Sequence, residues 1–343
     1  MIVLSILILL ATMAYSFHDL VSSQLAISRK DVDRFRAIQL AQAGLNLAIT
    51  LVKLDPQYTG GYTYLPDPAY QSKLIQAGGQ PSKLEEIYLL MRASEATGMP
   101  LENGSVAIKI RDEMGRFNLN AAEKAPEFLV NLLKVCNVRK RKKLTFSDTT
   151  AVDDISTPLA NSILDWLDKD STSRPEGAES SYYSEQTPSY RARNGPFESI
   201  DELMLLRHMD RRIMDGVPGS DTMPASLALK EFVTIFGATA QVNANAAPPE
   251  VLAAVPGIFE SANRQAIVAK LLESRPLRDF GAVSSVVNAA DPLAWNKAAP
   301  YLGPKSNLLR IQVKAHLGSY DGAVETVILR EPDNIRYLYW RES

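Results

Sequence analysis

The sequence predicts an α+β protein: a long N-terminal helix packed on a small antiparallel sheet, with a large α-helical insertion between the strands. Three observations support this fold class. Residues 1–54 contain no proline and a single glycine, residues 105–111 and much of 306–343 alternate between apolar and polar positions, and the sequence between these two groups is mostly of helical type. Alternation with a period of two is typical of half-buried strands. We therefore expect the two separated groups of strands to meet in one sheet across the insertion.

The first seventeen residues form an apolar tract without charge, proline or glycine. At a rise of about 1.5 Å per residue they give about 25 Å of helix, near the lower limit for crossing a hydrocarbon core of about 30 Å. The helical pattern continues to Leu54 and ends before Pro56, so we expect one rod whose first third lies in a membrane and whose last third packs on a globular body. A cleaved signal peptide would instead end in small residues and a break, which residues 15–18 do not provide.

The charges that flank the apolar tract leave the orientation open. No basic residue precedes the tract, whereas Arg29, Lys30, Arg34 and Arg36 follow it. The positive-inside rule would then place the globular part in the cytoplasm. The alternative is that a basic leader precedes the given sequence, which would place the globular part on the other side of the membrane.

The composition excludes several classes of function. With 46% apolar and 22% charged residues, a chain of 343 residues is expected to fold into two or three domains. A net charge of −2 does not favour nucleic acid as the main partner. Cys136 is the only cysteine, which excludes an intrachain disulfide and a multi-thiolate metal site. Since neither a nucleophile with its base nor a phosphate loop is recognisable, we do not expect an enzyme.

We divide the chain into four parts. They are a transmembrane or filament helix at 1–17, the rest of the long helix with the first strands at 18–122, a mainly α-helical insertion at 123–305, and the C-terminal strands at 306–343. Before the first strand, residues 57–80 predict an irregular connection and residues 82–96 a short helix with Ser82 as N-cap. Inside the insertion, we expect an acidic loop at 165–183 and an internal strand at 232–245.

One short pattern occurs twice. Phe117-Asn-Leu-Asn-Ala-Ala122 and Val242-Asn-Ala-Asn-Ala-Ala247 share an apolar residue, two asparagines in alternation and two alanines, and each leads from a strand to a helix. Asparagine at such a corner can cap the helix and bind exposed backbone amides. We interpret the pair as an architectural repeat, with a chance match as the alternative, and we expect residues 117–120 to join the same sheet as 105–111.

Further signals lie in the insertion. Helices are expected at 126–135, 157–167 and 199–209, and Ser199 with Glu202 has the capping-box spacing. The basic run at 139–143 is interpreted as a solvated loop, with contact to nucleic acid as the other possibility.

Residues 249–258 and 262–272 resemble the two short helices of a helix-hairpin-helix with a turn at Pro256 and Gly257. In DNA-binding versions of this motif, the hairpin amides contact phosphate. Because Glu260 follows where a basic or small residue would be expected, we favour a purely structural hairpin.

The acidic loop is a candidate cation site. Residues 168–179 place oxygen-bearing side chains at positions 1, 3, 5 and 9 and a glutamate at position 12, which is the ligand spacing of a calcium loop. The candidate ligands are Asp165, Asp168, Asp170, Glu176 and Glu179. The loop departs from an EF-hand because Ser173 replaces the glycine of position 6 and Pro175 the aliphatic residue of position 8. We predict bound Ca²⁺, and the alternative is a solvated acidic loop.

Together these segments resemble general secretion pathway protein K, the largest minor pseudopilin of type II secretion. The matching stretches, in family order, are the apolar N-terminal helix, 111–121, 164–168 with Asp170, 177–179, Tyr182 with Tyr183, 199–203 and 242–252. The resemblance implies a pilin-like fold whose insertion is similar to SAM or helix-hairpin-helix modules, and an acidic loop that binds calcium. It also implies a single-pass protein of the bacterial inner membrane with its globular part in the periplasm.

The resemblance also implies partners. Proteins of this family sit at the tip of a short pseudopilus with the minor pseudopilins I and J, on an inner-membrane secretion platform. Two features depart from prepilins in general: the leader that ends in glycine is absent, and Ser5 stands where the fifth residue is usually glutamate. Family K proteins also lack that glutamate, which fits a subunit with nothing stacked above it. We therefore predict a non-enzymatic tip subunit. The alternative is a membrane-tethered helix-hairpin-helix protein that binds DNA.

Overall fold

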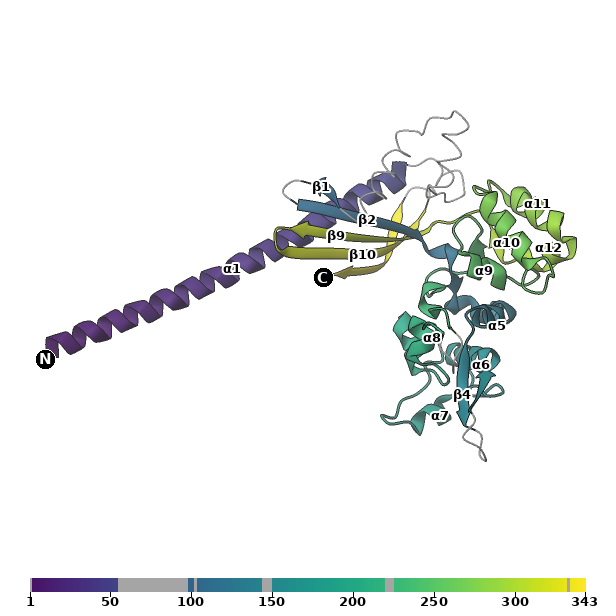
Figure 1. The fold of residues 1–343 in the computed structure, drawn as a ribbon, viewed down its shortest axis with the longest axis horizontal. Coiled ribbons are helices and arrows are strands. Elements are labelled where there is room, and N and C mark those ends of the chain that lie inside the picture. The colour runs from purple at the N-terminus through teal and green to yellow at the C-terminus, as the bar shows by residue number, and fades with distance from the viewer. Residues whose placement is uncertain (1, 55–97, 102–103, 144–149, 220–224, 332–333) are drawn as a thin grey trace.

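A computed structural model describes residues 2–54, 98–101, 104–143, 150–219, 225–331 and 334–343. The expected irregular connection at 57–80 and the expected helix at 82–96 lie outside these ranges. A long helix projects from one end of a sheet, and the insertion lies at the other end, away from the N terminus (Figure 1). The predicted α+β fold class is confirmed.

Helix α1 (Ile2–Leu54) is one continuous rod, as predicted. Its N-terminal part is exposed, and it is the one helix among the described residues that is long and apolar enough to cross a membrane. The C-terminal part packs on the sheet through a stripe of small and apolar side chains, which are Ala37, Ala41, Leu45, Ala48 and Val52. Gly44 allows a close approach, since a Cβ there would lie 2.5 Å from Cγ1 of Val106. Residues spaced three or four apart therefore form one buried face of α1.

The sheet has the order β1-β2-β9-β10-β11, and each pair of neighbours is antiparallel. The strands are β1 (Met99–Leu101), β2 (Gly104–Asp112), β9 (Leu308–Leu317), β10 (Tyr320–Arg330) and β11 (Ile335–Glu342). Strand β2 pairs with β9, with Ile108 opposite Val313, so the two groups of strands meet across the insertion as predicted. Alternate residues of these strands are buried against α1, which explains the alternation of apolar and polar residues in the sequence.

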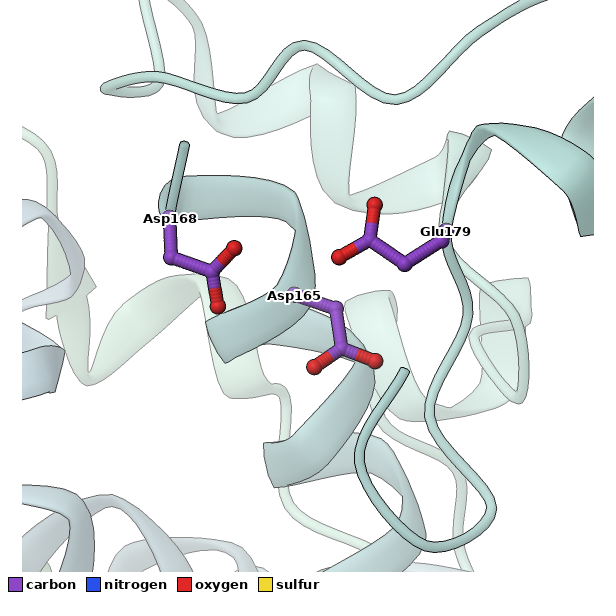
Figure 2. A group of neighbouring side chains, drawn as sticks. All are labelled: Asp165, Asp168 and Glu179. Atoms are coloured by element: carbon purple, nitrogen blue, oxygen red, sulfur yellow. The ribbon is translucent and has the colours of Figure 1, made fainter. Parts of the chain in front are cut away.

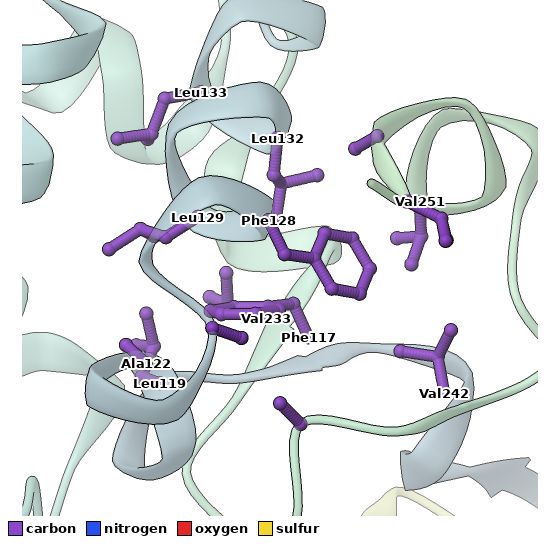
Figure 3. Packing of buried hydrophobic residues seen from close by; sticks show 14 of the residues in the cluster. Phe117, Leu119, Ala122, Phe128, Leu129, Leu132, Leu133, Val233, Val242 and Val251 are labelled. Carbon is purple, nitrogen blue, oxygen red and sulfur yellow. The ribbon is translucent and has the colours of Figure 1, made fainter. Parts of the chain in front are cut away.

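The insertion is built from short elements. They are η1 (Glu113–Gly115), β3 (Phe117–Asn118), η2 (Leu119–Lys124), α5 (Pro126–Val135), β4 (Arg139–Lys143), β5 (Thr150–Asp154), α6 (Ser156–Leu167), α7 (Ser180–Ser184), η3 (Ile200–Leu205), α8 (Arg211–Asp215), η4 (Leu229–Glu231), β6 (Val233–Thr234), β7 (Val242–Asn243), α9 (Pro249–Ala254), α10 (Arg264–Glu273), α11 (Phe280–Ala290), α12 (Pro292–Ala298) and β8 (Leu302–Gly303). Its core is separate from that of the sheet and α1. In it, Phe117 contacts Phe128 edge to face at 4.9 Å, close to Val242 and Val251 (Figure 3).

Three local predictions need correction. Strand β3 does not join the main sheet; it pairs in parallel with β6. The single strand expected at 232–245 is two separate strands, β6 and β7, and Gly237 between them has a left-handed φ of 107°. The 3-10 helix η3 is shorter than the helix expected at 199–209, although Ser199 and Glu202 do form the predicted capping box.

The basic run at 139–143 is also not a loop. It forms β4, which pairs with β5 and places Arg139 opposite Asp154 and Lys140 opposite Asp153. Opposite charges across a strand pair stabilise it, and Arg139 opposite Asp154 forms such a pair.

Candidate metal centre

Three acidic side chains converge where α6 ends and α7 begins. Asp165 lies in the last turn of α6, Asp168 is its C-cap residue, and Glu179 is the residue before α7. One carboxylate oxygen from each lies within 4.8 Å of the other two. Figure 2 shows the Glu179 side chain entering from the loop toward the two aspartates of α6. The loop between the two helices thus returns on itself and brings residue 179 back to residue 165.

This cluster is buried and only partly hydrogen-bonded. Asp165 is 0% exposed and Glu179 is 2% exposed. Both carboxylate oxygens of Glu179 and Oδ1 of Asp168 are buried without a hydrogen-bond partner. Burial, together with the neighbouring charges of Asp168, Asp165 and Asp170, raises the pKa of Glu179 to about 7. Buried carboxylates without partners are costly unless a cation binds them, so the cluster fits a hard divalent cation.

Gly177 lets the loop close over the cluster. A Cβ at this position would lie 2.1 Å from Oδ2 of Asp165, so a larger residue would displace that carboxylate. The amide of Gly177 donates to the carbonyl of Arg174 at 2.9 Å, and its carbonyl accepts from Nη1 of Arg207 at 2.8 Å. The guanidinium of Arg207 also lies over the ring of Tyr182 at 4.9 Å. These contacts fix the loop backbone to Arg207 and, through it, to Tyr182 of α7.

The structure brings together three of the five predicted ligands. Asp170 and Glu176 are exposed and lie outside the group of three. Oδ1 of Asp170 accepts from the amide of Thr172 at 2.7 Å, and the carbonyl of Glu176 contacts Nε2 of His208 at 3.0 Å. The order of an EF-hand loop is therefore not followed, because positions 3 and 9 are not in the cluster, whereas Asp165, which precedes the loop, is.

Sequence reasoning missed two residues of this region. Arg174 places its guanidinium against the cluster, with Nη1 at 2.7 Å from Oδ1 of Asp165 and in contact with Asp168 as well. Asn194 donates from Nδ2 to the carbonyl of Asp170 at 2.8 Å, and its Oδ1 is buried without a partner. In the sequence, Arg174 is marked only by being a basic residue within an acidic loop. No sequence signal marks Asn194, which is distant from the loop along the chain.

The donor set decides which ion the residues present can hold. Three carboxylates offer oxygen ligands alone, which suits Ca²⁺ and Mg²⁺ rather than metals that prefer nitrogen or sulfur. Asp165, Asp168 and Glu179 would hold the ion, and Ca²⁺ would supply a fixed positive charge that offsets theirs. Among the described residues, no other group of three His, Cys, Asp or Glu side chains comes this close together.

The helix-hairpin-helix region has a different arrangement. The amide of Gly257, in the turn after α9, donates to Oε2 of Glu260 at 2.5 Å. Oε1 of Glu260 accepts from Nδ2 of Asn131 on α5 at 3.2 Å. The amide that would face a phosphate is therefore bound to a carboxylate of the same chain. This contact agrees with the structural hairpin that the sequence favoured.

Comparison with known proteins extends these observations. Residues 115–217, which include the acidic cluster, match the family model described as type II secretion system (T2SS), protein K. The chain resembles type II secretion system protein K. A protein of that name from Pseudomonas aeruginosa is 29% identical over 155 residues, and one from Klebsiella pneumoniae is 27% identical over 130 residues. The resemblance inferred from the sequence is confirmed.

The extent of these matches differs between sequence and structure. The aligned region covers 45% of this chain and 41% of the Pseudomonas protein K, so it spans less than half of that relative. A chain in the crystal structure of the GspK-GspI-GspJ complex from the type 2 secretion system of enterotoxigenic Escherichia coli matches 92% of this chain and 99% of its own length. Its TM-score is 0.64 at 18% identity, which shows that the pilin-like fold of protein K is shared.

Proposed function

We propose that this chain is a minor pseudopilin that caps the tip of a type II secretion pseudopilus and has no enzymatic activity of its own. The observation that carries the proposal is the place of the insertion. It lies at the end of the sheet away from the N terminus of α1 (Figure 1). A pilin-like subunit that carries a bulky domain there leaves little room for another subunit to stack on top.

The exposed part of α1 supports assembly with other subunits. Above the apolar tract, Val32 is 48% exposed and Phe35 is 62% exposed on the helix surface. Apolar side chains at helical spacing usually pack against a neighbour. The proposed neighbours are the minor pseudopilins I and J, because the solved structure with the same fold is a complex of GspK with GspI and GspJ.

The apolar tract supports a membrane location. We propose that residues 1–17 anchor the chain in the bacterial inner membrane by a single span, with the globular part in the periplasm. The membrane candidate in α1 has a mean hydropathy of 1.7 in its most apolar window. The full chain should then fractionate with membranes, whereas a chain that starts near Ser23 should be soluble. Recovery of the full chain in the soluble periplasm would contradict the anchor.

The tip position is tested by labelling. The chain carries an epitope at its C terminus in assembled pseudopili, and gold-labelled antibody is located by electron microscopy. We expect one label at one end of each filament, and co-purification of the solubilised chain with I-type and J-type subunits. Label distributed along the filament would contradict the capping role. The membrane-tethered DNA-binding alternative has no support from the comparisons. The amide of Gly257, which would have to contact phosphate, donates its hydrogen bond to Glu260 instead.

We also propose that Ca²⁺ binds at Asp165, Asp168 and Glu179 and orders the loop between α6 and α7. The support is the buried Glu179 carboxylate, whose two oxygens have no hydrogen-bond partner. A ligand that binds the folded state alone raises stability by mass action. The test is calorimetry and thermal melting on the full chain in detergent, stripped with chelator and titrated with Ca²⁺ or Mg²⁺. Glu179→Gln should weaken binding and reduce the heat, and Glu185→Gln, an exposed acid outside the cluster, should not.

A further inference from the structure

The guanidinium of Arg174 occupies one carboxylate oxygen on each of two acids that would bind a cation. Its Nη1 contacts both Oδ1 of Asp165, at 2.7 Å, and Oδ2 of Asp168. These two residues belong to the candidate metal centre, and Asp165 is fully buried. Arg174 belongs to the loop between α6 and α7, which covers the candidate metal centre. Its side chain therefore reaches the acids from that loop.

The third acid of the centre is not neutralised by this contact. No hydrogen bond joins the Glu179 carboxylate to Arg174, and both of its oxygens are buried without a partner. The guanidinium brings one positive charge to the two aspartates and makes no contact with Glu179. A calcium ion held by all three carboxylates at about 2.3–2.6 Å would bring two positive charges and contact each of them.

A cation that binds through Oδ1 of Asp165 or Oδ2 of Asp168 would compete with this guanidinium. An ion at ligand distance from Oδ1 of Asp165 would lie within about 5 Å of the guanidinium nitrogen, which is 2.7 Å from the same oxygen. Like charges at such a separation repel strongly where water is scarce. The Arg174 side chain is 35% exposed, so it has a path from the cluster to solvent. Its backbone can stay in place, because the amide of Arg174 donates to Asp165 independently of the side chain.

We propose that Arg174 is a tethered competitor for the metal centre, which holds Asp165 and Asp168 in the cation-free protein and sets how tightly Ca²⁺ binds. This inference rests on the proposed calcium site and adds the residue that determines its affinity. The cation displaces the guanidinium, and the loop then exchanges an internal ion pair for a bound ion. The cation-free loop is thereby kept folded over the acids instead of being opened by their repulsion.

A merely structural ion pair and a competitor give opposite results when the charge is removed. If Arg174 only stabilised the fold, Arg174→Gln would weaken Ca²⁺ binding or leave it unchanged. If Arg174 competes, the same substitution lowers the melting temperature in chelator yet tightens Ca²⁺ binding. The melting temperature at saturating Ca²⁺ should then be nearly that of the parent chain, because the guanidinium is displaced in both.

The experiment compares the full chain in detergent with three single variants by calorimetry against Ca²⁺ and by thermal melting. We expect Arg174→Gln to lower the dissociation constant for Ca²⁺ by about tenfold or more. Lys169→Gln is the matched control, since it removes one positive charge from an exposed position of the same loop and should change the constant by less than about threefold. Glu179→Gln should weaken binding.

The outcomes separate this inference from the calcium site itself. Tighter binding in Arg174→Gln, or binding in that variant alone, supports the competitor. Binding by the parent chain with equal or weaker affinity in Arg174→Gln overturns the competitor and leaves the site. An equal gain in Lys169→Gln also overturns it, because the effect would then be one of net charge. If neither the parent chain nor Arg174→Gln binds Ca²⁺, the site and the competitor are both refuted.

Discussion

The two asparagine corners of the insertion have the same local structure. In the first, Oδ1 of Asn118 accepts from the amide of Asn120 at 3.0 Å. In the second, Oδ1 of Asn243 accepts from the amide of Asn245, also at 3.0 Å. Each first asparagine lies on a two-residue strand in a parallel pair, β3 with β6 and β7 with β8. The pattern in the sequence is therefore an architectural repeat, as interpreted.

The second asparagine of each corner clamps a distant segment. Oδ1 of Asn120 accepts from the amide of Phe197 at 2.7 Å, and Nδ2 donates to the carbonyls of Phe197 and Ile235. Oδ1 of Asn245 accepts from the amide of Leu277 at 2.7 Å, and Nδ2 donates to the carbonyls of Leu277 and Pro304. One side chain thus satisfies three backbone groups in each half of the insertion.

The two halves differ in the length and content of the segment between the asparagine and the residue that it clamps. The clamped residue lies 77 positions after the asparagine in the first half and 32 positions after it in the second. The longer first excursion contains the β4–β5 hairpin, α6 and the whole candidate metal centre. The same clamp therefore supports the candidate metal centre in one half and a structural hairpin in the other. The function of each half depends on the residues between corner and clamp.

Two adjacent acids connect the corners to the sheet. Oδ2 of Asp112, the last residue of β2, accepts from Nδ2 of Asn243 in the second corner at 2.7 Å. Oε2 of Glu113 accepts from the hydroxyl of Thr234, opposite Asn118 of the first corner, at 2.5 Å. Each half of the insertion thus has its own acidic anchor at the point where the chain leaves the sheet.

The largest effect should come from breaking the anchor of the first corner. Glu113 is fully buried, with Oε1 at 2.5 Å from Nε of Arg310 and at 3.6 Å from Nη1 of Arg116. Glu113→Ala leaves two largely buried arginines without this partner, which should lower the free energy of unfolding by about 3–5 kcal/mol. Denaturant unfolding of the full chain in detergent measures the loss. Glu231→Ala, an exposed acid near Arg111, is the control, and a comparable loss there would contradict the anchor.

Replacing the second asparagine tests whether the corners are equivalent in stability and different in function. Asn120→Ala and Asn245→Ala should each lower the free energy of unfolding by about 2–4 kcal/mol, because three backbone groups lose their partner. Only Asn120→Ala should also weaken Ca²⁺ binding, since its clamp holds the segment that follows Asn194. Asn46→Ala on the exposed side of α1 serves as control. Equal weakening by the two clamp variants in calorimetry would break the comparison.

Acid titration isolates the first anchor by its charge. Burial alone raises the pKa of Glu113, but the hydrogen bond and charge of Arg310, with Arg116 and Thr234, hold it below its ordinary value of 4.5. The unfolded chain therefore binds the proton first, and stability falls as the pH drops below about 4.5 toward the native pKa. We expect a shallower loss over this range in Glu113→Gln than in the parent chain. Parallel stability curves for the two proteins would show that Glu113 does not contribute to it.

The smallest expected effect concerns helix caps that follow both clamps. Two positions after the clamped residue, Ser199 caps η3 and Asp279 caps α11. Ser199→Ala and Asp279→Ala should each cost about 1 kcal/mol. Ser285→Ala, whose hydroxyl bonds to Gly281 within α11, should be nearly neutral. Clearly unequal losses from the two caps, measured by denaturant unfolding, would limit the equivalence of the halves to the corners themselves.

Local signals in the sequence were sufficient for the elements that carry them. Helix α5 begins at Pro126 and ends at Val135 as predicted, because proline at the first position and an apolar face are both local. The alternation in β2 and β9 likewise reflects one buried face. Strands β6 and β7 were not separable, since a two-residue strand is defined by its distant partner and not by its own pattern.

The sequence predicted which segment holds the candidate metal centre, but not which residues of that segment come together. Spacing along the loop selected Asp168 and Glu179, which the structure brings together with Asp165, but it also selected Asp170 and Glu176, which are exposed. The central position of Asp165 follows from the way the loop folds back on α6, and the position of Arg174 follows from that as well. A spacing rule selects candidate ligands by their position in the sequence alone. The fold decides which carboxylate oxygens are buried without a hydrogen-bond partner.

The pairing of β2 with β9 has a mechanical consequence. The chain leaves the sheet at Asp112 and returns at Leu308, one residue before Leu309, which lies directly across the ladder from Asp112. A load on the insertion thus enters two adjacent strands at the same end of the sheet. Along the strands it acts in shear on the eight residue pairs that join β9 to β2 and the ten that join it to β10, whereas a sideways torque opens such ladders one bond at a time. The pairing therefore resists a load along the strands better than a twist across them.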